Sequence, residues 1–398
     1  MRGKILGLLA ATALTLPMAA NAGGTQKSIS GTSGGLSFTA QSTIIGQTST
    51  ATIAGGGNPI YLANTPAYSG VVGLIMNYGT DAVTGNPINF ICSGTLAKDA
   101  RSIITAGHCV SDGFGKGGTP LSVTAYFGGG ASPDDAIRIA GGLPAAGVTA
   151  ISVSDIFVNP AYTGEVIDQN DIAVLRLSTW APSNAMRHDI LTAGDLTGAD
   201  FNVAGFGGRS DIGGAFGVNL GTGRLRQGDN KYDYRWGDAA FGGFFTDRDA
   251  AGENFFGLAE IDYSFVSDFD NGRAANDMSC RIAAAVGAPA GFGCDVGRGA
   301  TEVGVAGGDS GGPQFIGGKL ASVTSYGLSF GTGFGDCRAG LNSSCGEYSG
   351  YVPTYIHADF IRSVLAVPEP ATWLQMIFGF GLVGSILRRR QAAKAAVA

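Results

Sequence analysis

Gly308-Asp309-Ser310-Gly311-Gly312-Pro313 is the stretch from which the fold and chemistry of this chain can be argued. It sets a serine between small residues, directly after an acidic one. A serine hydroxyl is a weak nucleophile at neutral pH and needs a neighbouring base to take its proton. The stretch therefore predicts catalysis only if a histidine and a carboxylate accompany it elsewhere in the chain.

Both partners occur upstream of the serine. Thr105-Ala106-Gly107-His108-Cys109 carries a histidine, and Asp171 opens a run of alternating aliphatic residues that ends at Leu177. The order along the chain is histidine, aspartate, serine. We expect His108 to act as general base to Ser310 and Asp171 to orient its imidazole.

Two further histidines and one further carboxylate are weaker candidates. His188 and His357 stand outside any motif and are expected to be surface or packing residues. Asp168 lies close to Asp171, but Asp171 directly precedes the buried-strand pattern and is preferred.

These motifs together resemble the chymotrypsin/trypsin-like serine proteases. The six residues around Ser310 match in a row, and the histidine motif differs from the family's Thr-Ala-Ala-His-Cys by one small residue. Weaker matches follow in order: Cys92-Ser93-Gly94-Thr95-Leu96 resembles the strand before the histidine, Gly205-Phe206-Gly207 a Gly-Trp-Gly turn, and Ser325-Tyr326-Gly327 the strand that lines the substrate cleft. The resemblance extends from about residue 65 to 365.

The resemblance implies an all-β fold of two packed six-stranded antiparallel β-barrels with a C-terminal helix and the active site between the barrels. Short apolar runs between Gly, Asn and Asp clusters agree with such a fold. Residues 356–365 are the helical stretch at the end of the domain. The region 210–271 is longer than in typical members, and it is interpreted either as an enlarged surface hairpin or as a wall of the substrate cleft.

The resemblance also implies the rest of the site. The N–H groups of Gly308 and Ser310 are expected to form the oxyanion hole. Five residues are expected to form the substrate pocket: Gly304, Val305, Ser325, Tyr326 and Gly327. Gly304 stands where trypsin-like members carry an aspartate, which predicts an apolar pocket that disfavours Lys and Arg before the cut.

Asp309 is expected to be structural. In the family this acid pairs with a new amino terminus created by cleavage. Here no Arg or Lys precedes an Ile-Val-Gly-Gly sequence, and only Ile60 lies near the expected place.

Six cysteines predict three disulfides, which belong to an oxidising compartment. Fifteen pairings are possible from sequence alone. The resemblance implies Cys92–Cys109 and Cys280–Cys294, and it leaves Cys337 and Cys345 to pair with each other. Metal ligation is the rival interpretation, but no Cys-x-x-Cys spacing supports it. We expect neither a metal nor an organic cofactor.

The two ends of the chain carry targeting signals. Residues 1–22 form a predicted signal peptide, with a basic start, an apolar centre and the cleavage site Ala20-Asn21-Ala22. At the other end, Pro368-Glu369-Pro370 precedes an apolar run over 371–387 and then Arg388-Arg389-Arg390. This arrangement resembles the PEP-CTERM sorting signal of Gram-negative bacteria, whose helix an exosortase removes. A plain membrane anchor is the alternative.

The sequence thus predicts four parts: the signal peptide 1–22, a Gly/Ser/Thr-rich and poorly ordered extension or pro-segment 23–64, a protease domain 65–365 and a sorting segment 366–398. The net charge of −6 argues against nucleic-acid binding.

The predicted function is an exported serine endopeptidase that acts through an acyl-enzyme. We expect it outside the inner membrane of a Gram-negative bacterium, either secreted or at the cell surface or in the extracellular matrix. Its expected partners are protein or peptide substrates, signal peptidase and an exosortase-type enzyme, with transient insertion of the C-terminal helix in the membrane. The rivals are a catalytically silent binding module on this fold and a structural protein of the envelope or matrix.

Overall fold

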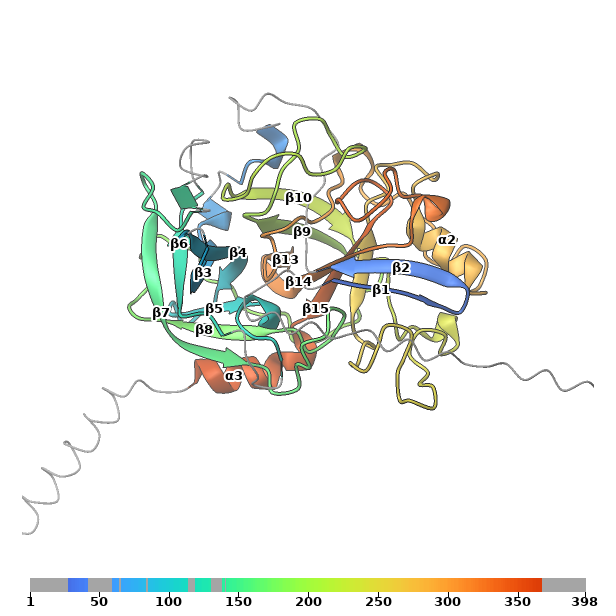
Figure 1. Ribbon diagram of the computed structural model, residues 1–398, viewed down its shortest axis with the longest axis horizontal. Helices are drawn as coiled ribbons and strands as arrows, with labels where there is room; N and C mark the ends of the chain where they lie inside the picture. The colour runs from blue at the N-terminus through green and yellow to red at the C-terminus, as the bar shows by residue number, and fades with distance from the viewer. Residues whose placement is uncertain are drawn as a thin grey trace, which may run out of the picture.

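The computed structural model describes residues 28–41, 59–63, 66–83, 85–113, 119–129, 138–139 and 141–366 (Figure 1). The predicted signal peptide and the predicted apolar run 371–387 lie outside these ranges. Within them, no helix is both long enough and apolar enough to span a membrane.

Six antiparallel strands of the first half of the chain close into a barrel in the order β3-β4-β5-β8-β7-β6. Their bounds are β3 Val71–Thr80, β4 Pro87–Leu96, β5 Ser102–Thr105, β6 Ser122–Phe127, β7 Thr149–Val158 and β8 Ala173–Leu177. Successive side chains of a strand point to opposite faces. Alternate aliphatic residues such as Val72, Leu74 and Met76 of β3 therefore fill the barrel interior.

The second half forms an antiparallel sheet in the order β10-β9-β13-β14-β15-β12-β11. Its strands are β9 Asp200–Gly205, β10 Arg226–Lys231, β11 Tyr234–Arg235, β12 Phe265–Asp268, β13 Pro313–Ile316, β14 Lys319–Ser329 and β15 Tyr348–Pro353. The predicted all-β class is confirmed. This path does not return to its first strand, however, so of the two predicted barrels only the first is closed by hydrogen bonds among the described strands.

Two α-helices, α2 and α3, are described in full. Helix α2 covers Met278–Ala285 and begins at Asp277, whose carboxylate accepts a hydrogen bond from the N–H of Cys280. Such a cap satisfies an N–H group that has no partner within the helix. Helix α3 covers Ala358–Leu365, as the sequence predicts, and buries Ile361 and Val364 against both halves of the molecule.

The two halves share a hydrophobic core. Val71, Ile104 and Val174 of the barrel lie in one cluster with Ala204 and Val323 of the second sheet. The loops that carry the predicted catalytic residues extend from strands on either side of this contact, so packing of the two halves fixes their relative positions.

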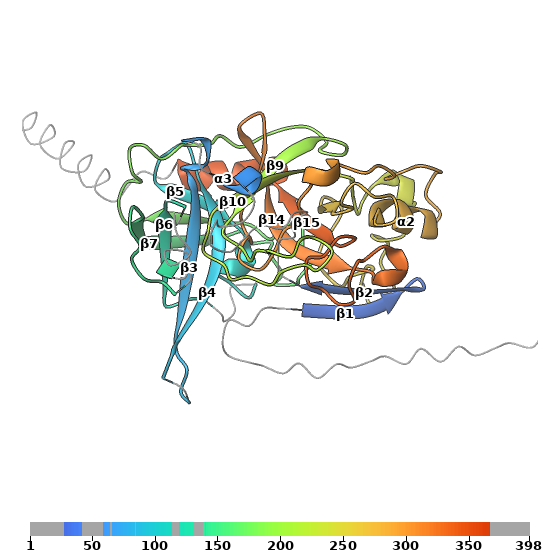
Figure 2. The same cartoon turned by 90° about the horizontal axis from the view of Figure 1, so that it is seen from above.

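The predicted poorly ordered extension contains a β-hairpin. Strands β1 (Ser28–Ser33) and β2 (Leu36–Gln41) pair with each other, and β2 also pairs with β14 (Figure 2). Leu36, Phe38 and Ala40 are buried. The expectation of a poorly ordered segment is therefore wrong for residues 28–41, because alternate residues of β2 face the core of the second half.

The long region 210–271 is not a surface hairpin. Its aromatic side chains are buried together with Phe38 of β2 and Phe330, and we call this group the aromatic cluster: Phe38, Trp236, Phe245, Phe255, Phe256 and Phe330. Rings such as Phe38 and Phe256 meet edge to face at 5.0 Å between centroids, an arrangement that adds to the gain from burial. The insert therefore builds a second core, which the N-terminal hairpin helps to cover.

Three disulfides join Cys92 to Cys109, Cys280 to Cys294, and Cys337 to Cys345. All three pairs are the expected ones: the family resemblance implies the first two, and it leaves Cys337 and Cys345 to pair with each other. The first ties β4 to the histidine turn, the second closes the region around α2, and the third is local.

Four acidic side chains are buried near the start of α2: Asp268, Asp270, Asp277 and Glu302. The half-buried Asp233 lies beside them and accepts from the N–H of Asp268 and the hydroxyl of Ser279. Burial, followed by repulsion from neighbouring carboxylates, raises the pKa of Asp268 and Glu302 well above their ordinary values. Backbone N–H groups of residues 270 and 271 donate to Glu302. The Asp270 side chain meets that of Glu302, and a hydrogen bond between two carboxyl groups requires a proton on one of them.

These raised pKa values predict that stability falls as pH rises. The folded chain keeps protons that the unfolded chain releases near pH 4, so the free energy of unfolding decreases by about 1.4 kcal/mol per pH unit for each carboxyl that stays protonated. Burial lowers the pKa of His188 and His357, so these two groups make stability rise with pH. Their effect ends at about pH 7, where histidines of the unfolded chain have also lost their protons. Urea unfolding of the Ser310→Ala protein at pH 7 and 8.5 should show a loss of about 2 kcal/mol per such carboxyl.

Asp270→Asn is the matched variant for this measurement. Its amide N–H can donate to the Glu302 carboxylate, and its carbonyl can still accept from the N–H of Gly272 as Oδ1 does now. The variant should therefore lose less stability between pH 7 and 8.5. An unfolding free energy that is constant or rises over this range in the parent protein would contradict the prediction.

Candidate active site

His108 and Asp171 form a close pair between two turns of the barrel. His108 lies on the 3-10 turn Gly107–Cys109, which directly follows β5. Its Nδ1 atom is 2.7 Å from Oδ2 of Asp171, and its backbone N–H donates to Oδ1 at 2.7 Å. A carboxylate can only accept hydrogen bonds. The contact therefore places a proton on Nδ1 and leaves the Nε2 lone pair of a neutral imidazole available as a base.

The Asp171 carboxylate is buried, and its two oxygens receive three donors. Besides the two from His108, the Ser325 hydroxyl donates to Oδ2 at 2.5 Å. Burial by itself would raise the pKa of Asp171, but the charge and hydrogen bonds of His108 and the Ser325 bond hold the pKa below its ordinary value. The side chain is therefore an anion that can stabilise a positive imidazolium beside it.

Asp168, the alternative carboxylate, makes structural hydrogen bonds and does not contact His108. Asp168 accepts hydrogen bonds from the N–H and hydroxyl of Thr163 and from the N–H of Asn170. Burial raises its pKa to about 6. Asp168 therefore holds the turn before Asp171, and it is Asp171 that contacts the imidazole.

The serine lies in a turn pressed against the barrel. The N–H of Ser93 donates to the Ser310 carbonyl at 2.8 Å, and the Ser93 hydroxyl donates to the Gly308 carbonyl at 2.8 Å. Gly311 has a φ of +76°, and a Cβ atom there would lie 2.0 Å from the Thr105 hydroxyl. Only glycine fits this close approach, so the motif's small residues let the serine turn reach the strand that leads to His108.

The N–H groups of Gly308 and Ser310 have no acceptor among the described residues. The carbonyls that share a peptide plane with these two N–H groups are themselves hydrogen-bonded: Gly307 accepts from the N–H of Gly208, and Asp309 accepts from the N–H of Gly312. Two fixed N–H donors that carry no other bond are what an oxyanion requires.

Asp309 is buried beneath this turn. Its Oδ1 atom accepts a hydrogen bond from the N–H of Gly207 at 2.6 Å, and a Cβ atom on Gly205 would lie 2.0 Å from the same oxygen. Burial raises the pKa of Asp309 to about 8, while the Gly207 bond and the charge of Arg226 oppose that rise. Arg226 pairs directly with Gly205 across β9 and β10 and lines the same small cavity as Asp309. Arg226 is thus a cation that faces Asp309 within the chain, which sequence reasoning did not identify.

The predicted pocket residues divide into two groups. Gly304, Val305 and Gly327 line one cavity of about 10 Å³, which holds about one water molecule. Ser325 instead contacts Asp171. Tyr326 is fully buried, and its hydroxyl is bound to Trp236 and Ser264.

The cavity also contains an acid that the sequence did not single out. Glu347 lines it, and its carboxylate accepts from the N–H groups of Asn342, Ser343 and Ser344. Burial raises the pKa of Glu347 to about 8. A residue far from Gly304 in sequence therefore supplies a carboxyl to the cavity that the predicted pocket residues line.

The remaining histidines have structural contacts, as expected. His188 stacks on Phe315 at 4.4 Å between ring centroids. His357 binds the carbonyl of Gln169 through Nε2 at 2.8 Å.

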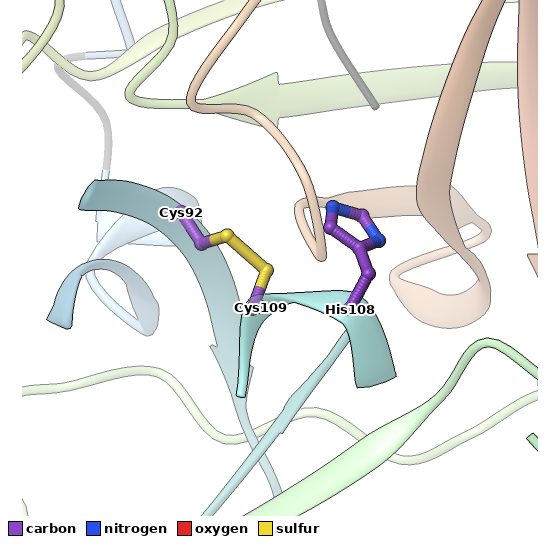
Figure 3. Close-up of side chains that lie close together, drawn as sticks. All are labelled: Cys92, His108 and Cys109. Carbon is purple, nitrogen blue, oxygen red and sulfur yellow. A yellow bond between two sulfur atoms is a disulfide. The ribbon is translucent and has the colours of Figure 1, made fainter. Parts of the chain in front are cut away.

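Cys92, His108 and Cys109 bring three potential metal-ligand atoms close together. Figure 3 shows that the two sulfur atoms are bonded to each other beside the imidazole. A disulfide supplies no thiolate, which is the form of cysteine that binds metals. The group therefore braces the histidine turn and does not fit a metal site.

Comparison with known families gives two matches. The sequence model of the Trypsin family matches residues 76–225, and that of the PEP-CTERM protein-sorting motif matches residues 366–391. The first match includes His108 and Asp171 and ends before Ser310. No curated protein matches the chain.

Proposed function

We propose that this chain, which contains a trypsin-family domain followed by a PEP-CTERM sorting motif, is an exported serine endopeptidase. The observation that carries the proposal is the His108–Asp171 pair, at 2.7 Å, on the turn against which the Ser310 loop packs. A trypsin-family domain supports a hydrolase of the serine-protease type. The assignment of His108, Asp171 and Ser310 as its triad is ours.

In this mechanism Nε2 of His108 takes the proton of the Ser310 hydroxyl as its oxygen attacks the substrate carbonyl. Asp171 holds the imidazole with Nδ1 protonated and stabilises the imidazolium that forms. The N–H groups of Gly308 and Ser310 donate to the carbonyl oxygen as it becomes negative. His108 then gives its proton to the leaving amine, and water releases the acyl group by the same steps in reverse.

The proposed organisation keeps residues 65–365 as the protease domain, with residues 23–64 before it. The hairpin within that preceding segment is part of the folded structure. Disulfides and the sorting motif both support a location outside the cytoplasm. An exosortase-type enzyme is the proposed processing partner, and peptides or proteins are the proposed substrates.

A small phosphonylating reagent that reacts only with activated serines tests the proposal. It should modify the full chain at Ser310, as located by peptide mass spectrometry. Ser310→Ala and His108→Ala should both resist modification while keeping the circular dichroism of the parent. A folded parent that resists the reagent would instead favour a silent binding module or a structural protein.

A further prediction concerns the tail. Pro368-Glu369-Pro370 precedes a short apolar run and three arginines, and positive residues of this kind stay on the cytoplasmic side. We expect the mature protein to lack Trp373 to Ala398 and to be recovered outside the inner membrane. Intact mass of the mature pool is the measurement, and a mass that includes Arg388-Arg389-Arg390 would contradict it.

A further inference from the structure

Strand β14 has one edge that passes the proposed catalytic serine. Strand β15 covers the other edge, with Tyr326 opposite Gly350 and Leu328 opposite Tyr348. On the first edge, β13 pairs with the beginning of β14, up to Val323. The loop that contains Ser310, which we call the serine loop, pairs with the next residue, Thr324. The N–H of Gly311 donates to the Thr324 carbonyl at 2.8 Å, and the N–H of Thr324 donates to Gly312 at 2.9 Å.

Strand β2 occupies the continuation of that same edge. Its pairs are Gly327 with Gln41, Leu328 with Ala40, and Ser329 with Thr39. Because β15 already holds the opposite edge at Gly327 and Leu328, β2 must lie on the edge that the serine loop uses. Between the serine loop and β2 remain Ser325, whose hydroxyl contacts Asp171, and Tyr326.

The direction of β2 matches that of a peptide cut at Ser310. An extended peptide that adds antiparallel to β14 runs from the Ser329 end towards the Ser325 end. Its residues before the cut would therefore lie opposite Gly327 to Ser329, with the scissile bond nearer to Ser310. Strand β2 runs the same way, and its last residue, Gln41, is the one closest to the triad.

The hairpin is held at this edge by more than backbone pairing. Leu36, Phe38 and Ala40 are buried. The ring of Phe38 contacts those of Phe255 and Phe256, at 5.5 and 5.0 Å between centroids. Both partners belong to the long region 210–271. The aromatic cluster thus provides a docking site for β2, which pairs with β14.

We propose that β2 is an intramolecular occupant of the substrate strand position, which closes the protease to extended peptides until the hairpin leaves β14. The inference rests on the proposed function. A strand added to a sheet edge gains main-chain hydrogen bonds that carry little sequence preference. Substrate and hairpin therefore compete for the same backbone groups of residues 327–329. A compound that reaches only Ser310 and His108 needs none of those groups.

Phe38→Ala in the full chain tests the inference. Loss of this ring removes the main aromatic contact of β2, so the hairpin should leave β14 more often. We expect kcat/KM for a peptide with five residues before the cut to rise at least tenfold. The rate of Ser310 modification by the small phosphonylating reagent should stay within twofold of the parent. Ser37→Ala, an exposed change on the opposite face of β2, should alter neither.

Hydrogen exchange on the unmutated chain provides a second readout. A peptide inhibitor that spans five residues before Ser310 should raise amide exchange of residues 36–41, while the small reagent should not. Unchanged exchange with the long inhibitor bound, or no gain in peptide cleavage by a Phe38→Ala protein that still reacts with the small reagent, would overturn the inference. Failure of the small reagent to modify the parent would instead count against the protease assignment itself.

Discussion

Replacing Ser310 with alanine should abolish peptide hydrolysis and leave the fold intact. The change removes the hydroxyl that forms the acyl-enzyme in the proposed mechanism. Loss of a triad nucleophile reduces kcat by about a millionfold in comparable serine proteases. The measurement is single-turnover and steady-state hydrolysis of a casein-type substrate by the purified variant.

The control for this variant is a serine on the surface of the barrel. Ser154 lies on the exposed barrel strand β7, where its hydroxyl contacts Asp155 and the carbonyl of Arg176. Ser154→Ala should keep hydrolysis within about twofold, because an exposed surface substitution has a small effect. Residual activity above about a hundredth of the parent in Ser310→Ala would refute the assignment of the nucleophile, since the expected loss is about a millionfold.

The catalytic motifs could be predicted from the sequence because each is local. The positions around Ser310 require glycine because of a few close neighbours. A Cβ atom at Gly311, for example, would lie 2.0 Å from the Thr105 hydroxyl. The closed barrel was predictable for a similar reason: alternating aliphatic runs separated by turns are visible within each strand.

Other features depend on contacts between distant segments and left no local signal. Phe38 is a single aromatic residue in a Gly/Ser/Thr-rich stretch, and its burial depends on Phe255 and Phe256. The Ser325 hydroxyl meets Asp171 only because β14 crosses beneath the histidine turn. Glu347 enters the cavity beside Gly304 from β15's preceding loop. A one-residue shift in strand pairing would move each of these side chains to the other face.

The two halves of the molecule also differ in what stabilises them near the site. In the barrel, the disulfide Cys92–Cys109 and aliphatic packing hold the turn that carries His108. In the second half, the β14 segment that carries Ser325 rests on Tyr326, whose hydroxyl is fixed by Trp236 and Ser264. The long region 210–271 therefore supports the catalytic geometry from behind, although it contributes no proposed triad residue.

Asp171→Asn should lower kcat by about ten-thousandfold, as the same change does in related triads. The carboxylate now accepts from the His108 backbone N–H on Oδ1, and from Nδ1 and the Ser325 hydroxyl on Oδ2. An asparagine has one acceptor oxygen and one N–H donor group. If its oxygen keeps the backbone bond, its amide N–H faces Nδ1, which must then accept, so the imidazole proton moves to Nε2. The opposite orientation would set the amide N–H against the backbone N–H of His108. The favoured arrangement therefore leaves Nε2 unable to take the Ser310 proton.

Nitrogen NMR of the imidazole should show the changed tautomer in Asp171→Asn. The control is Asp168→Asn, at a carboxylate that does not contact His108, and it should change kcat by less than tenfold. An Asp171→Asn protein that keeps a tenth of the parent kcat, or an equal loss in Asp168→Asn, would show that Asp171 does not orient the base.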